Sequence, residues 1–114
     1  MEQELQERIN TFNLMCYLKK TNLKKNGEAP IYMRITVRGN VANISMQGTV
    51  LPTAWSQAKE QCMGSDRKSR ELNHYIESAR ARIYAIHREL EIDGKPISAT
   101  ILKDRYLGKN EEEE

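Results

Sequence analysis

The side chains best suited to chemistry in this sequence are arginines, lysines, amides and tyrosines that recur at every second position. Residues 32–38, for example, place tyrosine, arginine, threonine and arginine two positions apart. Arginine can grip a phosphate or bond guanine through two N–H groups, and asparagine or glutamine can read adenine. This chemistry makes the following residues candidates for contact with a nucleic acid: Tyr17, Lys19, Lys24, Lys25, Tyr32, Arg34, Thr36, Arg38, Asn43, Ser45 and Gln47.

The basic side chains are concentrated in one third of the chain. The 114 residues carry a net charge of +2, yet residues 14–47 hold six basic residues against one acidic residue. Residues 1–13 carry a net charge of −2, residues 48–110 carry +3, and the tail Glu111–Glu114 carries −4. Because a local basic patch attracts polyanions even when the net charge is near zero, this distribution favours a polyanionic partner.

The sequence holds no arrangement typical of a catalytic or metal site. Cys16 and Cys62 lie 46 positions apart, and neither has a cysteine or histidine at metal-ligand spacing. Cys16 is expected in the core, whereas Cys62 falls in an expected loop, where it can be exposed. His74 and His87 belong to one expected helix, on which 13 positions separate them by about 220°. We therefore expect no catalytic residue, no metal ion and no cofactor.

The candidate contact residues require a sheet to hold them. Residues 11–20, 31–38 and 41–47 alternate apolar and polar side chains, which predicts three strands, each with one buried face. Asn26-Gly27 predicts a turn between the first two strands, and Gly39-Asn40 predicts a tight hairpin between the last two. No acidic residue occupies a polar position of these strands, which strengthens the case for a nucleic acid.

The rest of the chain changes to a helical period. Apolar residues recur at steps of four and three over residues 66–92, which predicts one long helix with a single apolar stripe. Ser98 can cap a shorter helix that ends near Leu107. Residues 48–64 are expected to form an irregular connection, in which Trp55 covers one end of the core.

These elements together predict an α+β fold. A three-stranded antiparallel sheet is packed on one face by the long C-terminal helix, with a short extra helix, and its other face is left to solvent or a partner. No apolar run approaches the ~18–20 residues that span a bilayer. No signal peptide opens the chain, so we expect a cytoplasmic protein with no membrane contact and no small-molecule substrate.

Other interpretations of the same residues remain open. The polar sheet face can be a solvated surface, or it can bind double-stranded RNA. The helix surface, with Arg80, Arg82 and Arg88, can instead make this chain a protein–protein interaction module. Its apolar stripe can also be a dimer seam, although packing on the bare sheet is the simpler use.

A family resemblance adds to this interpretation. It is carried by the run YLKKTNLKKNGEAPIYMRITVRGN over residues 17–40, a KSRELN helix start and a GKPIS-ATILKDRYLG ending. The order and spacing of these pieces, over residues 11–108, resemble the opening of tyrosine-recombinase integrases carried by bacterial mobile elements such as conjugative transposons.

The resemblance implies a function in DNA integration and recombination. It divides the chain into an N-terminal extension (1–10), an arm-type DNA-binding domain (11–94), and a short helix with an acidic linker (95–114) that leads toward a core-binding domain. The family's catalytic domain lies beyond this chain, so a non-catalytic piece of a longer integrase is expected. Its implied partners are double-stranded DNA, bound at arm-type sites through the sheet in the major groove, and other recombinase subunits. The implied contacts are chiefly Tyr32, Arg34, Thr36 and Arg38, supported by Lys19, Lys24 and Lys25.

Overall fold

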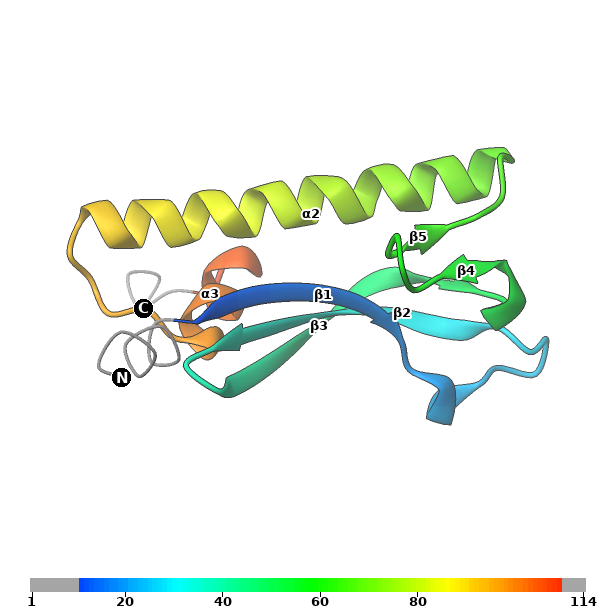
Figure 1. Ribbon diagram of the computed structural model, residues 1–114, viewed down its shortest axis with the longest axis horizontal. Coiled ribbons are helices and arrows are strands. Elements are labelled where there is room, and N and C mark those ends of the chain that lie inside the picture. Colours follow the sequence, from blue (N-terminus) through cyan, green and yellow to red (C-terminus); the bar gives the residue numbers. More distant parts are fainter. Residues whose placement is uncertain (1–10, 110–114) are drawn as a thin grey trace.

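The protein folds as a three-stranded sheet with two helices, which confirms the predicted α+β class (Figure 1). The computed structural model describes residues 11–109, so the expected N-terminal extension and acidic tail lie outside the described residues. The elements are β1 (Phe12–Leu18), η1 (Lys20–Asn22), β2 (Ala29–Val37), β3 (Asn40–Val50), η2 (Pro52–Ala54), β4 (Trp55–Ser56), β5 (Gln61–Cys62), α2 (Arg67–Ile92) and α3 (Ala99–Tyr106).

The sheet is an antiparallel meander in the order β1-β2-β3. Its apolar side chains lie on one face because side chains alternate along a strand, and the pairing Cys16↔Met33↔Ile44 aligns the three apolar sets. Helix α2 runs along this face, and α3 packs against β2, β3 and α2 on the same side (Figure 1). The opposite face of the sheet is covered by no element of the described chain.

The core lies between the sheet and the two helices. Ile31, Met33 and Ile35 are completely buried, and each side chain of this size contributes about 1.5–3 kcal/mol when it leaves water. The helical stripe behaves as predicted, since Ile76, Ala79, Ile83, Ile86 and Leu90 are buried. The cap of α3 is also confirmed, because the Ser98 hydroxyl oxygen accepts a hydrogen bond from the Ile101 N–H at 3.0 Å.

The β2–β3 hairpin turns one residue earlier than predicted. Val37 pairs with Asn40, so Arg38 and Gly39 are the central residues, with φ of 52° and 85°. Two positive φ angles suit the right-handed twist of the flanking strands, and glycine adopts one of them without strain. The prediction that Gly39-Asn40 forms the centre of the turn is therefore wrong, and Arg38 lies in the turn rather than in a strand.

The connection after β3 is more regular than expected. Strand β3 continues to Val50, and β4 and β5 form a small antiparallel ribbon within the segment predicted to be irregular. Trp55 is buried in this ribbon, as predicted. Cys62 lies in β5 rather than in a loop and is also buried, although its predicted loop position would have allowed exposure.

The amide of Asn73 fixes β5 to α2. Its Oδ1 accepts a hydrogen bond from the Cys62 N–H at 2.7 Å, and its Nδ2 donates to the Cys62 carbonyl at 3.0 Å. One side chain therefore satisfies both the backbone N–H and the backbone carbonyl of Cys62. This contact holds β5, which carries the buried Cys62, against α2.

Side chains of the turn between β4 and β5 also bond to the free edge of β1 at Cys16. Glu60 Oε1 accepts a hydrogen bond from the Cys16 N–H at 2.7 Å, and Gln57 Nε2 donates to the Cys16 carbonyl at 2.9 Å. Arg80 of α2 lies 3.3 Å from the same Glu60 oxygen, and Trp55 Nε1 donates to Gln57 Oε1 at 2.9 Å. The ribbon thus joins the helix to the sheet edge through polar contacts.

We expect Asn73→Ala to lower the free energy of unfolding by about 1–3 kcal/mol, because it leaves the Cys62 N–H and carbonyl without partners. Urea unfolding followed by circular dichroism measures the change. Ser78→Ala, at an exposed position of the same helix, is the control and should stay within about 0.5 kcal/mol of the wild type. Equal stability of the two variants would contradict the role given to Asn73.

We also expect alkaline pH to destabilise the fold through Cys16. Burial raises the pKa of its thiol to about 12, whereas an unfolded cysteine titrates near ~8.5. The thiol's contribution is fully present below pH ~8.5 and is lost as pH rises toward the folded pKa, because only the unfolded state ionises in that interval.

Urea unfolding at a series of pH values from 8 to 10.5 tests this expectation. Cys16→Ala should be less stable than the wild type at pH 8, with a shallower fall in stability at higher pH. Parallel pH profiles for the two proteins would rule out Cys16 as a source of the alkaline sensitivity.

Candidate nucleic-acid interface

The candidate interface is the sheet face turned away from α2 and α3, here called the open face. Its positions follow from the alternation of buried and solvent-facing residues along each strand. No described residue at these positions is acidic. The open-face residues are Asn13, Met15 and Tyr17 of β1, Tyr32, Arg34 and Thr36 of β2, and Val41, Asn43 and Ser45 of β3.

Tyr17 links the three strands across the open face. It pairs directly with Tyr32, while Arg34 pairs with Asn43, so the Tyr17 side chain lies diagonally over β2. Its hydroxyl donates a hydrogen bond to Asn43 Oδ1 at 2.9 Å. The Arg34 guanidinium carbon lies 4.6 Å from the centre of the Tyr17 ring, within the range of a cation–π contact.

This arrangement leaves hydrogen-bond donors free on both partners of Tyr17. Arg34 forms no hydrogen bond or ion pair with a described residue, so the N–H groups of its guanidinium remain available to a partner. The Asn43 carbonyl oxygen has one lone pair engaged by Tyr17, and its two N–H groups bond to no other described residue. The centre of the open face therefore presents amide and guanidinium donors.

A second cation–π pair lies beside the first. Lys19 Nζ is 5.1 Å from the centre of the Tyr32 ring, and the Tyr17 and Tyr32 rings are 6.2 Å apart. These contacts order one end of the open face, because each basic side chain has an aromatic surface against which to lie.

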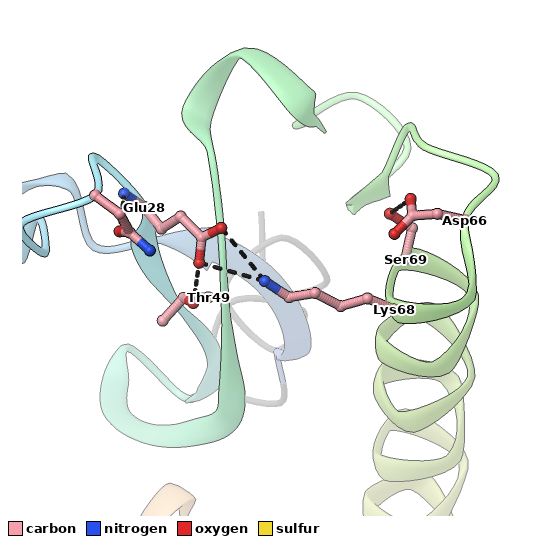
Figure 2. Close-up of polar contacts among 6 residues, drawn as sticks. Glu28, Thr49, Asp66, Lys68 and Ser69 are labelled. Carbon is pink, nitrogen blue, oxygen red and sulfur yellow. Dashed lines mark hydrogen bonds and ion pairs between the residues drawn. The ribbon is translucent and has the colours of Figure 1, made fainter.

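The remaining lysines flank the open face in the β1–β2 connection. Lys24 and Lys25 are exposed, and neither forms an ion pair with a described residue. The single acidic residue among residues 14–47, Glu28, lies next to them, but its carboxylate is bonded to Lys68 and Thr49 (Figure 2). The positive charge of this turn is thus available to a partner.

Two predicted contact residues leave the regular alternation. Arg38 is exposed in the β2–β3 turn. Gln47 has φ of 61°, in a bulge where β3 has two more residues than β2 between the pairs Tyr32↔Ser45 and Pro30↔Thr49. The Gln47 N–H donates to Ser45 Oγ at 3.1 Å, so the bulge is closed locally.

The structure brings Tyr17, Tyr32, Arg34, Thr36, Asn43 and Ser45 together on the open face and places Lys19, Lys24 and Lys25 at its margin.

Sequence reasoning missed Thr49 and Lys68, whose bonds to Glu28 join parts of the chain up to 40 positions apart. No local pattern marks such a contact; the only signal is that residues 14–47 contain a single acid.

The helix surface offers fewer free arginines than expected. Arg80 is held by Glu60 and also lies 3.6 Å from Glu77, so it does not extend into solvent as the protein-interaction hypothesis requires. Arg82 and Arg88 are exposed, as that hypothesis expects. The helix surface is therefore a weaker candidate than the open face for the main binding surface.

No other chemistry competes with the open face in the described chain. Both cysteine thiols are buried, and burial raises the pKa of each. His87 stacks on Phe12 with ring centres 4.1 Å apart, while His74 is exposed. Residues 11–109 contain no group of histidine, cysteine and acidic residues suited to a metal ion. Neither helix in this range has the length and apolarity to cross a membrane.

Comparison with known protein families gives a match over most of the chain. A family model described as an arm DNA-binding domain matches residues 16–103, from the middle of β1 into α3. The match includes every predicted contact residue, from Tyr17 to Gln47. No curated protein and no solved structure matches the chain.

Proposed function

This chain belongs to the arm DNA-binding domain family, and from that premise we propose that it binds arm-type sites in double-stranded DNA with sequence preference. The open face lies in the major groove, which is wide enough for a small twisted sheet. The observation that carries this proposal is the acid-free open face, on which Tyr17 holds Arg34 and Asn43 side by side.

In this proposal the open face contacts base edges and its margin contacts phosphates. Arg34 reads guanine through its N–H groups, and Asn43 donates to an acceptor on a neighbouring base. Lys19, Lys24 and Lys25 contact phosphates beside the groove and fix the position of the sheet on the duplex. Free donors at the centre and free cations at the margin support this division.

We further propose that the chain serves as the N-terminal module of a tyrosine recombinase. The family match and the resemblance over residues 11–108 support this role, in which the module itself performs no catalysis. The partners are then arm-type DNA and other recombinase subunits, and the process served is DNA integration and recombination.

The test of DNA binding is fluorescence anisotropy with a labelled duplex selected by the protein from a random library, beside a scrambled duplex, over a salt series. We expect tighter binding to the selected duplex. The log–log salt slope should be about −0.9 for each phosphate contacted. Equal binding to both duplexes would refute sequence preference, and no binding at low salt would refute DNA binding and favour a protein partner. Competition with an RNA duplex of the same sequence tests the RNA alternative.

Arg34→Ala should weaken binding to the selected duplex by about 1–3 kcal/mol and reduce the preference over scrambled DNA. The loss follows from the removal of N–H groups that read a base edge. Arg82→Ala, on the exposed surface of α2, removes the same charge and should leave the preference unchanged. An equal loss on both duplexes would make Arg34 a phosphate contact, and no loss would remove it from the interface.

Tyr17 allows its two contacts to be separated. Tyr17→Phe keeps the ring beneath Arg34 but loses the hydroxyl bond to Asn43, so it should cost about 0.5–1.5 kcal/mol of binding. The loss should disappear in an Asn43→Ala background, because the hydroxyl acts through Asn43. Tyr17→Leu should cost more than Tyr17→Phe, since it also removes the cation–π contact. A loss that persists in the Asn43→Ala background would mean that the hydroxyl meets DNA directly.

A further inference from the structure

Glu28 is placed where an acidic residue is least expected in a DNA-binding surface. It follows directly on the turn that carries Lys24 and Lys25, and it is the only acid among residues 14–47. A carboxylate here opposes the attraction of DNA phosphates, so its contacts should explain its presence.

The Glu28 side chain binds the two elements beside the turn. One carboxylate oxygen accepts a hydrogen bond from the Thr49 hydroxyl, near the end of β3. Lys68 Nζ, in the first turn of α2, lies 3.3 Å from both carboxylate oxygens. Figure 2 shows the Lys68 side chain extending from the helix to the Glu28 carboxylate, to which Thr49 also bonds.

The Glu28 backbone closes the turn itself. Its carbonyl accepts a hydrogen bond from the Lys24 N–H at 2.8 Å, and its N–H donates to Asn26 Oδ1 at 3.0 Å. The Gly27 N–H donates in turn to the Lys24 carbonyl at 2.9 Å. Glu28 therefore connects the basic turn to both β3 and α2. Its backbone belongs to the turn, and its carboxylate bonds Thr49 of β3 and Lys68 of α2, a set of contacts here called the anchor.

The anchor stays charged under ordinary conditions. The hydrogen bond from Thr49 and, after it, the contact with Lys68 lower the pKa of the Glu28 carboxyl below its usual value. Lys68 also neutralises the carboxylate locally, which limits its repulsion of DNA.

We propose that Glu28 is a positioning residue for DNA binding, which fixes the Lys24–Lys25 turn against β3 and the start of α2 so that both lysines meet phosphates beside the groove. This inference rests on the proposed function. Lys68, although basic, serves as the partner of Glu28 rather than as a phosphate contact.

The positioning role and simple electrostatic repulsion predict opposite changes in DNA affinity when the Glu28 carboxylate is removed. If the carboxylate only repels phosphates, Glu28→Ala should strengthen DNA binding, and most of all at low salt. If the carboxylate anchors the turn, Glu28→Ala should weaken binding about 3- to 10-fold, because the freed turn must be ordered on the DNA. The sign of the change therefore decides between the two.

The experiment measures anisotropy with the selected duplex for the wild type, Glu28→Ala and Glu91→Ala. Glu91 is exposed near the far end of α2, so its variant removes the same charge away from the turn and should stay within about twofold of the wild type. The same variants are then compared in a Lys24→Ala/Lys25→Ala background. There the loss caused by Glu28→Ala should vanish, since Glu28 acts through these lysines.

Hydrogen exchange of the free protein tests the anchor without DNA. In Glu28→Ala the amides of Lys24 and Gly27 should exchange faster, while those of the β2 core should not change. Unchanged turn amides would overturn the anchor, even if the wild type bound no DNA and the proposed function had failed. With DNA bound, unchanged or stronger binding of Glu28→Ala, or an equal loss in the lysine-free background, would overturn the positioning role.

Discussion

Burial of only one face of a three-stranded sheet is the constraint on which the structure depends. Helices α2 and α3 cover the face formed by residues such as Met33 and Ile44, and the alternation of the strands then sends the polar side chains to the other side. An apolar residue in place of Arg34 would put a hydrophobic side chain in water. The same division that stabilises the core thus gathers the donors of the open face.

Most of the fold could be predicted because its signals are local. The two-residue period of the strands, the apolar stripe of α2 and the Ser98 cap each depend only on residues that lie close together in the sequence. The β4–β5 ribbon was missed because strands of two residues have no period to detect. The position of Cys62 against α2 was not predicted, because the contact that holds β5 there comes from the Asn73 side chain, which lies 11 positions away.

Membership of the open face was predictable, but its internal contacts were not. The face of each strand residue follows from its position in the alternation, whereas the Tyr17–Asn43 bond depends on the register across β2. Gln47 shows the limit of the alternation, because a bulge interrupts it within β3. Which residues touch DNA is still a prediction, since the match to the family speaks for the domain rather than for its side chains.

The closed edge of β1 has a consequence for how such domains crowd together. Gln57 and Glu60 occupy the outward N–H and carbonyl of Cys16, so this residue near the middle of the strand offers no backbone group to a foreign strand. A second copy brought alongside β1 therefore meets an edge whose backbone groups are partly occupied, which disfavours the extension of one sheet into the next. Such side-chain protection of an edge strand is one way in which a sheet resists aggregation.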